Sequence, residues 1–209
     1  MPGGTFQFLG GILARDSTVS IAVPFLEPSA SGHNSSSPPV SIPDIKDPSK
    51  RQAAIGGFVA MNALVATLMV YDEEQFDYKL LALGTLISSL EYTGNMLPDY
   101  EKPTWEARIL AAITIVEIAG EKIQHWDIEY ESGPLIGKAG AGGPLWDGIH
   151  GFCKERWGLW QRRFLELGVD TSETLLSDET REKARKAGEA MLKLSAGPDE
   201  GSSEASPSS

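Results

Sequence analysis

The sequence predicts an all-α protein, a single-domain bundle of about five helices with a long glycine-rich loop before the fourth. Between residues 49 and 194, apolar residues recur at intervals of three and four, which is the spacing of one helix face. The 209 residues suffice for one ordinary domain. Prolines and serines before this range, and glycines and serines after it, predict a poorly ordered N-terminal segment (1–48) and a disordered C-terminal tail (195–209).

The first helix is expected to begin at Ser49, whose hydroxyl can cap it. The acidic run at residues 72–74 is expected to end it. Its apolar positions are Ile55, Phe58, Val59, Val65 and Met69.

Within this helix, the stretch Ala53–Val70 is uncharged and follows Lys50 and Arg51. Its eighteen residues reach the lower length limit for a membrane span. Five alanines and two glycines make it less hydrophobic than a leucine-rich span. We therefore expect a helix buried on most sides, and membrane association is the minor alternative.

Two further helices are predicted before the glycine-rich loop. Leu80, Leu83, Ile87 and Leu90 form a stripe that ends near Gly94, so the second helix is expected to lie antiparallel to the first. After Pro98 and Pro103, Thr104 can cap a long helix that runs to about Tyr130. Its apolar face comprises Trp105, Ile109, Ala112, Val116, Ala119, Ile123 and Trp126.

Between Ser132 and Gly151, seven glycines and two prolines predict an irregular loop. The fourth helix follows, with Gly168 as its expected end. A fifth helix is expected to begin at a Ser177 cap. The apolar stripes of these two helices are Cys153, Trp157, Trp160, Phe164 and Leu167, and Ala184, Ala187, Met191 and Leu194.

Net charge and cysteine content limit which binding partners and which cellular compartment are expected. The net charge of −11 repels phosphate backbones, so nucleic acid is not expected as a partner. Cys153 is the only cysteine, so no disulfide forms within the chain and a cytoplasmic location is favoured, with the nucleus as alternative. No basic residue precedes the short apolar run at residues 6–14, which argues against secretion.

Two patterns resemble cofactor or metal sites but fail on spacing. Gly133 and Gly137-Lys138 lack one residue of a phosphate loop, and Ala139 stands where its magnesium-binding hydroxyl belongs. Carboxylates and one imidazole recur every fourth residue on the third helix, but opposite its apolar stripe, where a solvated face is expected. The carboxylates and the imidazole of this second pattern are Glu117, Glu121, His125 and Glu129. No cofactor or metal is therefore expected.

The most distinctive chemistry lies between residues 146 and 164. Asp147, His150 and Cys153 step by three, so a cysteine nucleophile with a histidine base is a weak candidate for catalysis. Tryptophan and arginine are enriched at binding surfaces, so this segment is a candidate binding site. The alternative is that the tryptophans pack in the core while Glu155 and the arginines, including Arg156, stay in solvent. The candidate binding residues are Trp146, Arg156, Trp157 and Trp160.

The segments 143–148 (GPLWDG) and 151–164 (GFCKERWGLWQRRF) resemble the C-terminal signature of a domain-of-unknown-function family of filamentous fungi. Segments 62–68, 81–91, 111–120 and 180–191 resemble its other helices, so the resemblance covers about residues 52–194. The sequence departs from that pattern before residue 50. The resemblance implies an all-α fold, and no activity or functional residue.

These observations favour a non-catalytic protein that binds another protein or an apolar small molecule. The alternative is an enzyme or accessory protein of fungal secondary-metabolite biosynthesis, acting on an apolar substrate. Enzymatic activity and self-association are both left open.

Overall fold

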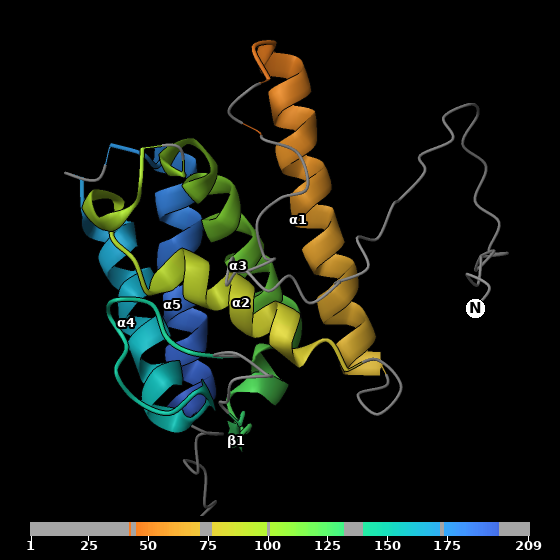
Figure 1. The fold of residues 1–209 in the computed structure, drawn as a ribbon, viewed down its shortest axis with the longest axis vertical. Helices are drawn as coiled ribbons and strands as arrows, with labels where there is room; N and C mark the ends of the chain where they lie inside the picture. The colour runs from red at the N-terminus through yellow and green to blue at the C-terminus, as the bar shows by residue number, and fades with distance from the viewer. Residues whose placement is uncertain are drawn as a thin grey trace, which may run out of the picture.

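The computed structural model describes Ile42 and residues 45–71, 77–99, 101–131, 140–171 and 174–196. Five α-helices dominate these residues (Figure 1), which confirms the predicted all-α class. Most of the predicted N-terminal segment and C-terminal tail lies outside them. The elements are α1 (Pro48–Tyr71), α2 (Lys79–Leu90), the short 3-10 helix η2 (Gly94–Met96), α3 (Lys102–Ile123), β1 (Ile128–Glu129), β2 (Gly151–Phe152), α4 (Lys154–Val169) and α5 (Asp178–Ala196).

Helix α3 is central, because α1, α2 and α5 all pack on it. Its predicted apolar stripe is buried from Trp105 to Ile123, and Glu117 and Glu121 are exposed, as expected. Its predicted extension to Tyr130 is wrong. The helix ends at Ile123, because the following backbone pairs instead with β2, with Ile128 opposite Phe152.

The helix ends show which capping predictions hold. Ser177 caps α5, since its Oγ accepts a hydrogen bond from the backbone N of Thr180. Ser49 does not cap α1; the carboxylate of Asp47 accepts from the backbone N of Ser49 and Lys50. The helix begins one residue earlier than predicted, because Pro48 is itself its first residue, a position that proline favours. The residue before it, Asp47, is therefore the cap.

Helix α1 packs mainly on α3, at one edge of the bundle (Figure 1). Asn62 is buried and accepts a hydrogen bond from the Thr85 hydroxyl of α2 at 3.1 Å. Near the start of α1, Ile42 and Phe58 form a small core with Ala107 and Ala111 of α3.

By length and composition, α1 is the one described helix that could cross a membrane, with a mean hydropathy of 2.0. Only 28% of its apolar window is buried inside the protein. The predicted helix is therefore present, but its outer face is uncovered by the described residues, and it is less buried than expected.

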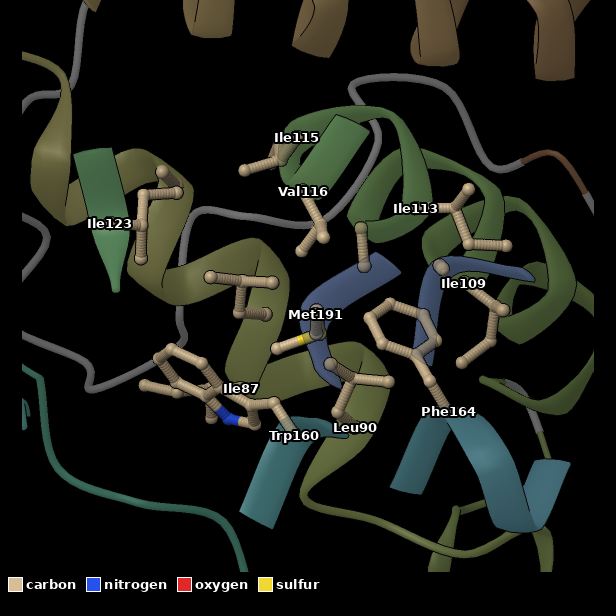
Figure 2. Packing of buried hydrophobic residues seen from close by; sticks show 14 of the residues in the cluster. Ile87, Leu90, Ile109, Ile113, Ile115, Val116, Ile123, Trp160, Phe164 and Met191 are labelled. Carbon is tan, nitrogen blue, oxygen red and sulfur yellow. The ribbon is translucent and has the colours of Figure 1, made fainter. Parts of the chain in front are cut away.

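The main core lies between α2, α3, α4 and α5, where Leu90, Ile109, Trp160 and Met191 point toward one another (Figure 2). Leu80, predicted to belong to this core, is 47% exposed, and α2 ends at Leu90 instead of near Gly94.

Helices α4 and α5 pack very closely. A Cβ at Gly168 would lie 2.6 Å from the Cβ of Arg185. Gly168 was expected to terminate α4, but the helix continues to Val169, so this glycine serves close packing instead.

Candidate functional site

A buried carboxylate, that of Glu91, lies at the centre of a network of polar contacts between α2, α4 and the loop before α4. Glu91 follows directly after α2 and is 0% exposed. It is the only charged residue between positions 80 and 98 of the sequence. A buried carboxylate needs a charged partner and hydrogen bonds, because isolated burial of a charge is very costly.

That partner is Arg156, in the first turn of α4, which is also 0% exposed. Its Nε donates to Oε1 of Glu91 at 2.7 Å, and its Nη2 donates to Oε2 at 3.0 Å. This two-pronged geometry is the strongest arrangement available to an arginine and a carboxylate. We call this ion pair the Glu91–Arg156 clamp.

The remaining polar atoms of the clamp hold the loop that precedes α4. Oε2 of Glu91 also accepts from the backbone N of Gly143 at 2.7 Å. Nη1 of Arg156 donates to the carbonyl oxygens of Gly140 and Gly151, at 2.9 and 2.7 Å. The clamp therefore joins the end of α2, both ends of the loop segment 140–151, and α4.

Gly143 sits against the end of α2 so closely that a side chain is excluded. A Cβ there would lie 2.8 Å from the carbonyl oxygen of Glu91 and 2.7 Å from the ring of Tyr92. The backbone N of Leu145 also donates to the Glu91 carbonyl, at 3.2 Å. The glycine thus lets the loop backbone reach the clamp.

Two tryptophans complete the clamp. The guanidinium carbon of Arg156 lies 5.3 Å from the ring centroid of Trp146 and 5.6 Å from that of Trp160, within the range of cation–π attraction. The indole N–H of Trp160 donates to Oε1 of Glu91 at 2.8 Å. Trp157 points elsewhere, because its indole N–H donates to Ser195 of α5.

Beside the loop, an open hollow of about 710 Å³ adjoins β1. Burial raises the pKa of Tyr130 to about 12, with a smaller contribution from the negative charge of Asp77. Its phenol therefore stays protonated at neutral pH. The backbone N of Tyr130 donates to the carbonyl of His150 at 2.7 Å, and this hydrogen bond joins the two segments that line the hollow, residues 129–131 and 148–150. The lining residues are Glu129, Tyr130, Glu131, Gly148, Ile149 and His150.

The three candidate catalytic residues lie in different settings. His150 lines the hollow, whereas Asp147 and Cys153 are not among its described lining residues. Asp147 is exposed, and Cys153 is half-buried immediately before α4. Burial raises the pKa of the Cys153 thiol, so the protonated, weakly nucleophilic form predominates at neutral pH.

Comparison with known proteins connects this architecture to a family. A family model described as a protein of unknown function (DUF3632) matches residues 14–164, well over half of the chain. The chain belongs to this family. No curated protein and no solved structure matches it.

The match includes the whole clamp of this DUF3632 protein, since Glu91, Gly143, Arg156 and Trp160 all lie within it. It begins at residue 14, well before the resemblance noted in the sequence, and it ends before α5. Membership carries no activity with it.

The structure brings three of the four candidate binding residues together, Trp146, Arg156 and Trp160, and places Trp157 apart from them. The expectation that Arg156 stays in solvent is wrong, because Glu91 holds it in the core. Arg181 of α5 is another buried arginine, since it is 8% exposed and donates to the Leu176 carbonyl. Whether any of the four contacts a ligand stays a prediction.

Glu91 is the residue that sequence reasoning missed. The available signal was its isolation, as a single acidic residue following the apolar helix 79–90. No group of three or more metal-ligating side chains occurs among the described residues, and Glu117, Glu121 and His125 are exposed as separate surface groups.

Proposed function

We propose that this protein is a non-catalytic binding protein. The observation that carries the proposal is the saturation of the Glu91–Arg156 clamp. Both carboxylate oxygens and all three guanidinium nitrogens are engaged by the protein's own groups. Groups used in this way stabilise a shape and are not available to exchange protons with a substrate.

The shape that the clamp holds supports a binding site at the hollow beside β1. Its volume of about 710 Å³ lies within the range of small-molecule pockets, roughly 300–1,000 Å³. Tyr130 and Ile149 offer apolar surface, and Glu129 and Glu131 offer negative charge. We propose as ligand a small molecule with an apolar body and a cationic group, which the net charge of −11 also attracts.

A thermal-shift comparison tests this proposal. Aromatic amines should raise the melting temperature of the wild-type protein, while neutral molecules of the same shape should raise it less. The double variant Glu129→Gln/Glu131→Gln should lose the preference for the amine, whereas Glu117→Gln, an exposed carboxylate on α3, should keep it. Equal shifts for amines and neutral molecules, or no shift with any, would contradict the proposal.

We propose no enzymatic function. The alternative of a secondary-metabolite enzyme depends on a Cys153 nucleophile, and the raised pKa of its thiol does not favour that chemistry. A fungal source and a cytoplasmic location remain proposals. They rest on the resemblance of residues 143–164 and on the single cysteine, respectively.

A further inference from the structure

The hollow beside β1 carries two carboxylates on one of its walls. Glu129 and Glu131 both line it, and both are exposed. Within the described part of the chain, neither side chain has a salt-bridge or hydrogen-bond partner. The described lining residues include no lysine or arginine. The two negative charges therefore face a cation that comes from solution.

The backbone sets the spacing of these carboxylates. The strand β1 ends at Glu129, but its pairing continues for one more residue, because the backbone N of Tyr130 donates to the carbonyl of His150. In an extended chain alternate side chains project from the same face, so Glu129 and Glu131 project together and Tyr130 projects from the other face. The Cα atoms of the two glutamates are about 7 Å apart, twice the rise per residue of a strand. Two separate cations match this spacing better than one, because a single cation would also draw the two like charges together.

The opposite wall is apolar at Ile149 and is held in place by the clamp. The indole N–H of Trp146 donates to the Ile149 carbonyl at 2.9 Å, and the ring of Trp146 lies against Arg156. A Cβ at Gly148 would lie 2.3 Å from the Trp146 ring, so this glycine sits directly on the indole. The half-buried Ile149 then offers a fixed apolar surface across from the two carboxylates.

We infer that the hollow selects a dication, a diamine with a short apolar body. Its two ammonium groups pair with Glu129 and Glu131, and its body lies against Ile149. The inference rests on the proposed amine-binding function of the same site. It adds a second positive charge and a distance between the two charges, and each addition can fail by itself.

The first test compares two probes that share one aromatic ring. In para-xylylenediamine the ring carries two aminomethyl groups, whereas in para-methylbenzylamine one of them is replaced by a methyl group. Isothermal titration calorimetry on the full chain at low ionic strength measures both affinities. One added exposed ion pair raises affinity by up to about fivefold, so the diamine should bind about fivefold more tightly than the monoamine. High salt should reduce this difference, because exposed ion pairs are screened.

Single substitutions then locate the two charges. Glu129→Gln and Glu131→Gln should each weaken diamine binding by about fivefold, because each removes one of its two ion pairs. Each should weaken monoamine binding by only about twofold, because the remaining carboxylate still binds the single ammonium group. Glu121→Gln, at an exposed carboxylate of α3, should change neither affinity. Circular dichroism checks that all three variants are folded.

A positional isomer tests the spacing at constant charge. In ortho-xylylenediamine the two aminomethyl groups are on adjacent ring carbons, so its ammonium groups are closer together than in the para isomer. It should bind no more tightly than the monoamine. Equal binding of the two isomers would mean that overall charge attracts them, since the net charge of the chain is −11, and would overturn the inference.

The remaining outcomes separate this inference from the proposed function. Equal affinities for diamine and monoamine, with only one of the two glutamates affecting either, would overturn the dication and leave amine binding intact. Amine binding that neither Glu129→Gln nor Glu131→Gln changes would place the amine elsewhere and overturn both. The absence of binding by any of the three amines would overturn the proposed function, and the inference with it.

Discussion

Replacing Arg156 with methionine tests how much the Glu91–Arg156 clamp contributes to stability. Methionine has a similar length and no charge, so the substitution removes the guanidinium while it largely fills the space. The carboxylate of Glu91 then stays 0% exposed without its ion partner. The carbonyl oxygens of Gly140 and Gly151 also lose their donor.

The expected cost is large. Breaking a fully buried ion pair by removing one partner destabilises a protein by about 3–5 kcal/mol. Natural domains have a total stability of roughly 5–15 kcal/mol, so Arg156→Met should lose a major share of it. Arg156→Lys should lose less, because it keeps the charge but not the paired hydrogen bonds. Arg162→Met, an exposed arginine on the same helix, should change stability by less than about 0.5 kcal/mol.

Urea unfolding followed by tryptophan fluorescence measures these differences. The double variant Glu91→Leu/Arg156→Met adds a further check, since it removes both charges together. It should be more stable than the sum of the single losses predicts, but less stable than the wild type, because Gly143 N and the Trp160 indole lose their acceptor. An Arg156→Met variant as stable as Arg162→Met would refute the reasoning.

Two other substitutions test the packing of α5 against its neighbours. Gly168→Ala should lower the free energy of unfolding in urea by about 1–3 kcal/mol, because its Cβ would lie 2.6 Å from that of Arg185. As a control, Gly158→Ala should raise it by about 0.5 kcal/mol, because the nearest atom to its Cβ would be 3.6 Å away. Equal effects of the two substitutions would contradict this account. Although burial opposes it, hydrogen bonds from Ser177 and Thr180 hold the pKa of Glu106 below its ordinary value. A lowered pKa adds stability above the unfolded-state pKa, so the advantage of the wild type over Glu106→Gln should shrink as pH falls from neutrality into the acid range; a constant difference would show that the charge is not involved.

Most of the helical fold could be predicted because apolar periodicity reports one buried face directly. The stripe from Trp105 to Ile123 and the Ser177 cap are examples. The errors occur where contacts between distant parts of the chain determine the local structure. The helix α3 stops at Ile123 because residues 128–129 pair with residues 151–152, and a pairing across such a distance leaves no local pattern. Gly168 illustrates the same limit, because a glycine required by a neighbouring helix looks like a helix terminator.

The site was predicted less well than the fold, for a related reason. The density of tryptophan and arginine located the region, and Trp146, Arg156 and Trp160 do lie together. Their main partner, Glu91, is 65 residues from Arg156, and sequence periodicity carries no information on such pairs. Charge was also misleading, since a charged residue is normally solvated unless it finds a partner in the core. The prediction that Arg156 lies in solvent followed that rule.

The clamp also bears on where function can reside. A buried ion pair is weak evidence for added stability, because well-packed apolar residues often do as well. The Glu91–Arg156 pair differs from two apolar residues in one respect, since it satisfies backbone groups of a loop that has no regular structure to satisfy them. Its role is then to give the segment 140–151 one defined shape beside β1.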